Sequence, residues 1–489
     1  MKDLKERTLR GGLAKVFSQG ASFVLRIGSL AALARLLNPE DFGLVGMVSV
    51  VSGIFSLFKD AGLSTVTIQR ETISDREVSA LFWLNMLVGL TLATLLIAVA
   101  PFLAAFYREP RLVPVALVLS SGFLFSSVGV QHQALLSRQM RFTALASVEV
   151  IAVLSSVVVG LITAWSGLGY WALVAMAVVV PAVSSVAYWF LVPWVPSRPR
   201  REPGVSAMIR FGGTLSLNTL LIYIMFNADK FVIGKLWGAE TLGLYGRASQ
   251  LISLPTENLN SAIGAVAISG LARAQTDPSL FRSYFLKGYS LLCSLTVPVM
   301  VSCALFADDI VYVLLGAKWT SAAVIFRLLA PAFTAFSFIT PLGWILLATG
   351  RARRGLNMAF VLVPSVILGC MAGLPYGPEA VALGLSVSMV LLTPPMVMWA
   401  RYDTVVTNSD LIQSLKPAVF SSIGAALVGL AAYLWVGNLL SPLPRLVLET
   451  AALLASYVLF LLYAFGQKEL YIDLLAYLKR APSTVSAVE

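Results

Sequence analysis

The feature that most constrains this chain is a series of about fourteen long apolar runs separated by short polar connectors. A membrane-spanning helix needs roughly 20 mostly apolar residues, which is about the length of each run. Of all residues, 58% are apolar and only 12% are charged, far from the composition of soluble globular domains. We therefore predict an all-α polytopic membrane protein with helices at about 13–36, 41–62, 78–106, 112–130, 143–165, 168–193, 210–234, 241–270, 286–306, 321–349, 356–374, 379–400, 416–436 and 445–466.

One short stretch occurs twice, 200 positions apart. Residues 35–46 read RLLNPEDFGLVG, and residues 235–246 read KLWGAETLGLYG. A cation, a leucine, a glutamate, a glycine, a leucine and a second glycine keep the same spacing in both copies. Each copy lies between two apolar runs, which is typical of a turn that joins a pair of helices. The repeat predicts two similar lobes of six helices, followed by two further helices.

A connector rich in proline and arginine lies between the two predicted lobes. Such a stretch cannot continue a helix and stays solvated. We therefore predict an N-terminal lobe over 1–196, a cytoplasmic linker over 197–209, and a C-terminal lobe over 210–402. Helices 13 and 14 follow over 403–467. The cytoplasmic tail over 468–489 has leucines at helical spacing, which is typical of an amphipathic helix on a membrane surface.

The basic residues of the chain are unevenly distributed between its connectors. With the N-terminus in the cytoplasm, the cytoplasmic segments hold 23 lysines and arginines and the opposite side holds 6. The positive-inside rule then places both termini in the cytoplasm. The net charge of +11 is explained by this topology, so we do not expect a nucleic-acid partner.

No sequence pattern indicates catalysis or a bound cofactor. The chain has no phosphate-binding loop of the Walker type, no metal-ligand spacing and no G-x-S-x-G motif. The outer connectors are short, whereas a membrane polymerase or ligase would need a sizeable outer loop with catalytic residues. We predict a protein that is not an enzyme, has no cofactor, and takes its energy from an H⁺ or Na⁺ gradient or from a partner.

Polar side chains recur on single faces of several predicted helices. The first helix carries Ser22 and Arg26, and the seventh carries Tyr223, Asn227 and Lys230. The eighth helix contributes Gln250, and the second has serines 49, 52 and 56 followed by a lysine and an aspartate. Serine stripes alone also suit helix packing in lipid, because small residues let backbones approach closely. The charged members favour a water-filled cavity, since a charge at mid-bilayer costs roughly 2.5–3.5 kcal/mol.

The arginines of these faces are candidates for binding an anion. Arg26 lies about 20 Å along the first helix, near mid-membrane, and we favour a ligand role for it. Asp229, Lys230, Arg247 and Arg327 have similar predicted depths. They form either an ion-paired cluster or a site where guanidinium groups bind phosphate in a bidentate manner.

Three carboxylates are candidates for proton or sodium coupling: Glu257, Asp229 and Asp60. Glu257 follows the predicted kink at Pro255 by two residues and lies deepest, so it is the first candidate. Asp60 lies close to the predicted cytoplasmic surface.

Several blocks of sequence are similar to those of a known family. The block LLNPEDFGL at 36–44, with DAGLS at 60–64 and IQR at 68–70, resembles the N-terminal signature of bacterial polysaccharide exporters. The block DKFVIG at 229–234, which continues into GAETLGLY at 238–245, resembles their mid-chain signature. LGAKW at 315–319 and ATGR at 348–351 are similar to later landmarks. The chain most resembles Wzx-type oligosaccharide flippases of the colanic-acid-exporter-like branch, within the multidrug/oligosaccharidyl-lipid/polysaccharide flippase superfamily.

The resemblance implies two lobes related by an axis normal to the membrane, around a cationic cavity that opens alternately to each side. It implies export of undecaprenyl-diphosphate-linked oligosaccharide across the bacterial inner membrane for surface polysaccharide synthesis. Arg26 and Arg247 match, by helix and polar face, positions at which such flippases carry arginines. Membrane lipid and polysaccharide polymerase machinery are the expected partners, and we expect a monomer. A drug or organic-cation antiporter and a peptidoglycan-precursor flippase of the same superfamily are the alternatives.

Overall fold

The computed structural model describes residues 2–60, 73–198, 217–436 and 439–468, together with Ser64, Thr67, Ile68 and Arg70. Over these residues every regular element is a helix. The chain divides into two compact units. Unit 1 comprises Met1–Arg247 and Leu314–Trp319, and unit 2 comprises Ala248–Val313 and Thr320–Glu489.

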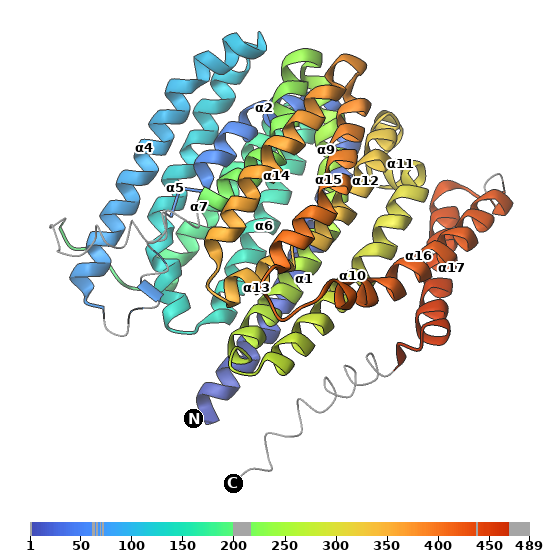
Figure 1. The fold of residues 1–489 in the computed structure, drawn as a ribbon. Coiled ribbons are helices and arrows are strands. Elements are labelled where there is room, and N and C mark those ends of the chain that lie inside the picture. Colours follow the sequence, from blue (N-terminus) through green and yellow to red (C-terminus); the bar gives the residue numbers. More distant parts are fainter. Residues whose placement is uncertain are drawn as a thin grey trace. The chain divides into compact units, whose positions relative to one another are not determined.

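Unit 1 is a bundle of long helices (Figure 1). Helix α4 packs along α5, α5 packs along α7, and α6 packs against both α1 and α7. Small residues permit these approaches: a Cβ atom at Gly89 of α4 would overlap the side chain of Ser127 on α5. The described helices of unit 1 are α1 (Lys2–Leu36), α2 (Pro39–Ser56), α4 (Asp75–Tyr107), α5 (Leu112–Arg138), α6 (Phe142–Trp165), α7 (Trp171–Leu191), the helical residues 217–225, and the part of α9 (Ala228–Arg273) that ends at Arg247.

Unit 2 is likewise a helical bundle. In it α12 and α14 pack against α15, and α16 packs against α10 and α17. Its described helices are the rest of α9, α10 (Pro278–Leu305), α11 (Ala307–Leu315) up to Val313, α12 (Ala322–Ile339), α13 (Leu342–Ala348), α14 (Ala352–Gly373), α15 (Pro378–Arg401), α16 (Asn408–Val436) and α17 (Pro442–Leu459).

Helix α9 contains the turn that the sequence places between the seventh and eighth helices. Helix α9 spans this turn, but its Gly238 has φ 81° and ψ −172°, which is not helical. Only glycine adopts this backbone region readily, because it has no Cβ atom. The two predicted helices therefore meet at Gly238.

The structure agrees with the prediction of about 14 helices. Among the described residues, eleven helical stretches are long and apolar enough to cross a membrane. One of them, Leu217–Arg273, contains the two helices that meet at Gly238, and α1 and α2 are further helices. The predicted helix at 321–349 is divided into α12 and α13 by a break before Leu342.

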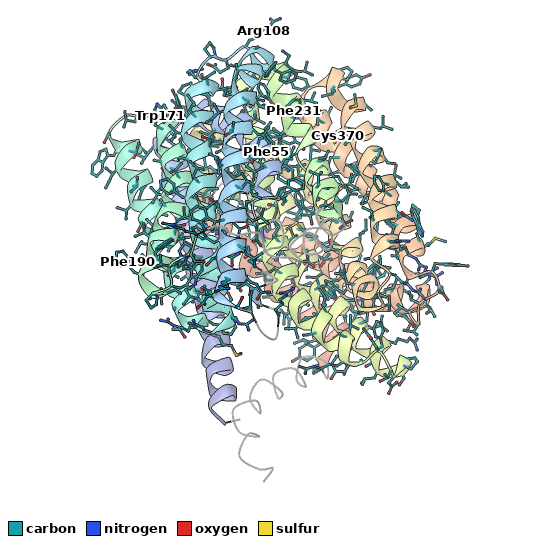
Figure 2. All side chains as sticks on the ribbon, turned by 90° about the vertical axis from the view of Figure 1, so that its left-hand side faces the viewer. Phe55, Arg108, Trp171, Phe190, Phe231 and Cys370 are labelled. Carbon is teal, nitrogen blue, oxygen red and sulfur yellow. The ribbon has the colours of Figure 1, made fainter. Side chains whose placement is uncertain are left out.

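Large apolar side chains cover the outside of the bundle. Figure 2 shows Trp171 and Phe190 projecting from the two ends of α7, and Phe190 is 85% exposed. Aromatic side chains are enriched at both interfaces of a membrane, and exposed apolar residues between them suit a lipid environment. The protein is a multi-pass membrane protein.

Two predicted segments lie mostly or entirely outside the described residues. They are the linker at 197–209, of which only Ser197 and Arg198 are described, and the amphipathic tail helix at 468–480, of which only Lys468 is described. The domain boundaries that depend on them stay predictions.

Candidate functional site

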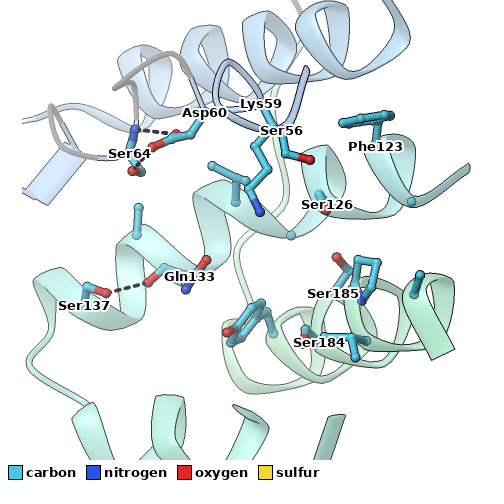
Figure 3. Close-up of a pocket in the computed structure, with 18 of the residues that line it drawn as sticks. Ser56, Lys59, Asp60, Ser64, Phe123, Ser126, Gln133, Ser137, Ser184 and Ser185 are labelled. Carbon is cyan, nitrogen blue, oxygen red and sulfur yellow. Dashed lines mark hydrogen bonds between the residues drawn. The ribbon is translucent and has the colours of Figure 1, made fainter. Parts of the chain in front are cut away.

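The candidate site in unit 1 is a cavity of about 680 Å³ between α2, α5 and α7 (Figure 3). We call it the serine pocket. Its volume is in the range of small-molecule sites. Hydroxyl groups from all three helices and from Ser64, which follows α2 in the chain, line it: Ser52, Ser56, Ser64, Ser126, Ser137, Ser184, Ser185 and Tyr188.

Two charged residues lie at one edge of the serine pocket. Lys59 is exposed and extends toward α5 (Figure 3). Among the described residues no carboxylate forms an ion pair with it. Asp60 instead accepts hydrogen bonds from the backbone N–H of Ser64, at 3.0 Å, and from the Ser64 hydroxyl. Among the described lining residues, Lys59 is the cationic group of this edge.

A glycine on α5 brings α7 close enough to complete the pocket. A Cβ atom at Gly129 would overlap the Ser185 side chain and would lie 3.0 Å from its Cα atom. The Ser185 hydroxyl donates a hydrogen bond to the backbone oxygen of Phe125, one turn earlier on α5. Of the two labelled α7 serines, Ser185 is buried and Ser184 is partly exposed.

The predicted residues on α1 have different environments. Ser22 is buried, and its hydroxyl has no hydrogen-bond partner among the described residues. Arg26, one turn later, is exposed, and its carbonyl accepts a hydrogen bond from Ser29 at 2.9 Å. The guanidinium of Arg26 is therefore accessible, as a ligand role would require.

The predicted polar face of the seventh helix packs partly on α2. The Tyr223 hydroxyl donates to the backbone oxygens of Ser49, at 3.2 Å, and Val50, at 3.0 Å. A Cβ atom at Gly53 would overlap this hydroxyl, so the glycine makes room for it. Asn227 donates to the Tyr223 carbonyl and accepts a hydrogen bond from Lys230 at 3.2 Å.

Asp229 is buried, and its hydrogen-bond partner belongs to the other of the two helices that meet at Gly238. Its carboxylate accepts a hydrogen bond of 2.6 Å from the hydroxyl of Tyr245, on the other side of Gly238. The guanidinium of Arg247 lies 4.2 Å from the ring centroid of Phe42, in the first copy of the repeated turn. This distance is suitable for a cation–π interaction.

The remaining predicted residues belong to unit 2. Arg327 forms an ion pair with Asp308 at 2.5 Å and donates to the carbonyl of Ala304 at 3.2 Å. Gln250 and Glu257 are exposed on α9. Of the four residues of similar predicted depth, Asp229, Lys230 and Arg247 are therefore in unit 1, while Arg327 has a carboxylate partner within unit 2.

The two copies of the repeated turn contact each other within unit 1. A Cβ atom at Gly43 would overlap the backbone of Ala239, and one at Gly243 would overlap the backbone of Pro39. The contacts are reciprocal, because 39 and 43 correspond to 239 and 243 at the repeat offset of 200. Two equivalent helix starts thus pack backbone against backbone.

Further residues hold the first copy in place. Trp319 donates from its indole nitrogen to the carbonyl of Ala34 at 2.9 Å, and its ring lies 5.2 Å from that of Phe42. Lys318 donates to the side-chain oxygen of Asn38 at 3.0 Å. The LGAKW block at 315–319 is thereby anchored to the LLNPEDFGL block.

Arg111 connects the turn to the connector between α4 and α5. It forms ion pairs with Glu40 at 2.6 Å and with Glu109 at 2.7 Å. Its hydrogen bond to Glu109 holds the pKa of that carboxyl below its usual value. This end of unit 1 is therefore fixed by charge pairs.

Sequence reasoning did not name Lys59, Ser126, Gln133, Ser184 or Ser185 as site residues. Ser52 and Ser56 of the second-helix stripe line the pocket and lead directly to Lys59. This serine stripe was the feature of the sequence that could have identified Lys59 as a site residue. The serines of α5 and α7 gave none, because each lies within an otherwise apolar run.

Comparisons with known proteins agree on one family. A profile of the family described as "Polysaccharide biosynthesis protein" matches residues 32–324. The teichuronic acid biosynthesis protein TuaB of Bacillus subtilis is 27% identical over 347 residues, which is 71% of each chain. The lipopolysaccharide biosynthesis protein WzxC of Escherichia coli is 24% identical, over 80% of this chain and 79% of WzxC.

Solved structures show the same fold. The lipid II flippase MurJ, in an inward closed conformation, has a TM-score of 0.75 at 12% identity and covers 95% of this chain and 100% of MurJ. An inward-facing multidrug resistance transporter of the MATE family has a TM-score of 0.65 at 16% identity, over 78% of this chain and 94% of that structure. These likenesses confirm the predicted fold class.

Proposed function

Because the chain belongs to the family of polysaccharide biosynthesis proteins, we propose that it is a flippase for lipid-linked oligosaccharides. It moves undecaprenyl-diphosphate-linked repeat units from the cytoplasmic to the periplasmic leaflet by alternating access. Relatives named for teichuronic acid, lipopolysaccharide and succinoglycan biosynthesis support this cargo class. The resemblance to Wzx-type flippases that the sequence blocks indicate is confirmed by the same matches.

The observation that carries the proposal is the serine pocket inside an apolar bundle. A sugar exposes hydroxyl groups that lose their water partners on entering a membrane, and a lipid core offers no replacement. Serine hydroxyls both donate and accept hydrogen bonds, so a wall of serines accepts sugars with different hydroxyl patterns. A purely apolar cargo could not form hydrogen bonds with these serines.

The cationic groups of unit 1 suit the diphosphate of the carrier. Lys59 lies at the edge of the serine pocket, and Arg26 is exposed on α1. Arg247 is the third candidate, held over the Phe42 ring. We propose that these three residues bind the diphosphate.

The other predicted contacts remain part of the proposal. Ser22, Tyr223, Asn227, Lys230, Gln250 and Arg327 are assigned to substrate binding, and Glu257, Asp229 and Asp60 to ion coupling. Two of these residues already have partners. A ligand that binds Arg327 must compete with Asp308, and an ion that binds Asp229 must compete with the Tyr245 hydroxyl.

The protein acts in the inner membrane of a bacterium, with both termini in the cytoplasm. It works as a monomeric transporter rather than an enzyme, uses no cofactor other than a coupling H⁺ or Na⁺, and passes its cargo to polysaccharide polymerase machinery. A drug antiporter and a peptidoglycan-precursor flippase share the fold, so the fold does not separate them from this proposal. The family profile and the named relatives favour polysaccharide cargo.

Deletion of the gene in its native host tests the proposal. We expect loss of one surface polysaccharide and accumulation of its lipid-linked unit on the cytoplasmic side. Normal polysaccharide in the deletion strain, with no similar gene compensating, would contradict the flippase assignment.

A point substitution tests the pocket. Lys59→Gln should lower export roughly tenfold, because a charge-assisted hydrogen bond contributes about 1.5–3 kcal/mol and 1.4 kcal/mol is a factor of ten. The measurement is surface polysaccharide in a complemented deletion strain, normalised to the amount of membrane-inserted protein. Arg76→Gln, at an exposed arginine outside the pocket, is the matched control and should export normally. Equal export by both variants would remove Lys59 from the site.

A further inference from the structure

Glu449 is a buried carboxyl group that the proposed transport site does not use. It lies in α17 of unit 2 and is 0% exposed. Neither of its carboxyl oxygens has a hydrogen-bond partner among the described residues. Buried polar side chains are normally satisfied, so a carboxyl group without partners needs a physical explanation.

Two charged residues lie near Glu449. Arg445, one turn earlier on α17, and Asp309 on α11 are the groups that interact with it electrostatically. Arg445 binds Asp309 through both arms of its guanidinium: Nε donates to Oδ2 at 2.8 Å, and a terminal nitrogen donates to Oδ1. Asp309 is 2% exposed. On α16, Tyr433 is the titratable group that interacts with Arg445.

Among the described residues, this cluster has one cation, Arg445, for two buried carboxyl groups. Burying an ionised carboxylate without a cation or hydrogen bonds is strongly unfavourable, because nothing replaces its lost hydration. With Asp309 ionised and Glu449 protonated, the three residues carry no net charge. Loss of the proton leaves one uncompensated negative charge inside unit 2.

Arg445 can form a bidentate pair with only one carboxylate at a time, and that carboxylate is Asp309. Residues four apart on a helix lie on the same face, so the Arg445 guanidinium is within reach of Glu449 as well as Asp309. An ionised Glu449 would compete with Asp309 for it. Because Asp309 is on α11 and Glu449 is on α17, this competition would weaken the attachment of α17 to α11.

We propose that Glu449 is a proton-binding site whose occupancy controls the docking of α17 on α11. A role for Glu449 in coupling proton movement to transport, in addition to the three carboxylates assigned above, rests on the proposed flippase function. The proton leaves the carboxyl group for bulk water, Glu449 becomes a carboxylate, and Arg445 is shared between two anions. A metal cation is disfavoured because Arg445 already supplies positive charge, whereas a proton needs no further ligands.

A neighbouring pair provides the contrast. Asp308, the residue before Asp309, pairs with Arg327 of α12 at 2.5 Å. Both side chains are open to solvent, with exposures of 59% and 45%, and among the described residues no third charge forms an ion pair with either of them. Asp308→Asn is therefore a matched control for changes at Asp309 and Glu449.

Infrared difference spectroscopy of the full-length protein in lipid nanodiscs, titrated with pH, tests the proposal without any substrate. A protonated carboxyl group has a C=O stretching band that disappears on ionisation. We expect the wild type to show a band that Glu449→Gln lacks and Asp308→Asn retains. Subtracting one variant from another removes the contribution of other buried carboxyl groups such as Asp229.

A second variant keeps the test decisive if Glu449→Gln does not fold. In Asp309→Asn the guanidinium of Arg445 is left to Glu449, so Glu449 should ionise and its band should be lost at neutral pH. A wild type without a titrating band, or a band unchanged in both variants, would overturn the proton site. Normal polysaccharide export by Glu449→Gln would overturn its coupling role. Failure of the flippase assignment would appear only in the export assay and would leave the infrared result unchanged.

Discussion

The two copies of the repeated turn use different chemistry to reach the same packing. In the first copy Asn38 is extended, at φ −96° and ψ 158°, and Pro39 begins α2. The Asp41 side chain accepts a hydrogen bond of 2.9 Å from the Asn38 N–H, as in a capping box. In the second copy, the equivalent of Asn38 is Gly238, at φ 81° and ψ −172°.

What the copies share is the pair of glycines that follows. Gly43 and Gly243 each lie against the backbone of the other copy, whereas Gly46 and Gly246 have room for a side chain. The turn itself therefore tolerates two solutions, a capped helix start and a glycine kink, because either one reverses the chain. The contact between the copies tolerates only glycine, because backbone lies where a Cβ atom would be.

The substitution Gly43→Ala tests this contact and should have the largest effect. The added methyl group meets the Ala239 backbone, which cannot move like a flexible side chain. Overpacking of this kind costs typically 1–3 kcal/mol, and we expect about 3 kcal/mol here. The measurement is the free energy of unfolding in detergent, with Gly243→Ala expected to behave alike.

The second glycine of each copy gives a matched control. A Cβ atom at Gly46 would lie 3.6 Å from the Leu242 side chain, an ordinary contact, and one at Gly246 would meet nothing within 4 Å. Gly46→Ala and Gly246→Ala should change the free energy of unfolding by at most about 0.5 kcal/mol. Equal destabilisation at all four positions would show that the glycines act through helix propensity and not through contact.

The substitution Gly238→Ala tests whether the second copy depends on a glycine kink where the first copy has a capped helix start. A residue with a Cβ atom in this backbone region is strained by about 1–3 kcal/mol, and we expect about 2 kcal/mol. Asn38→Gly at the equivalent position loses the exposed hydrogen bond from Lys318 but keeps an acceptable N-cap residue, so it should cost no more than about 1 kcal/mol. Thermal unfolding of the two variants side by side is the measurement. A larger loss in Asn38→Gly would contradict the assignment of the kink to the second copy alone.

The sequence predicted the helices well because a membrane imposes a length of roughly 20 apolar residues on each. The repetition of the turn is visible in the sequence, but the contact between its two copies was not predicted from it. The sequence could not predict which backbone conformation Gly238 adopts where the two helices meet, because glycine permits both a stop and a kink.

The candidate site was less predictable from the sequence. Tyr223 binds α2 through the backbone oxygens of Ser49 and Val50, which lie more than 170 positions away. Asp229 pairs with Tyr245 and Arg327 with Asp308, and helical spacing cannot select such partners. The serine pocket depends on Gly129 bringing α7 against α5, an approach that is a property of packing and not of periodicity.

Asp41→Ala should have the smallest effect. It removes the side-chain acceptor for the Asn38 N–H at the start of α2, and loss of a cap interaction typically costs about 1 kcal/mol. The equivalent residue in the second copy is Thr241, which follows the kink at Gly238. Thr241→Ala should therefore stay within about 0.5 kcal/mol of wild type in the same unfolding experiment. Equal losses at both positions would mean that the second copy also begins with a side-chain cap, and the contrast between a capped start and a glycine kink would fail.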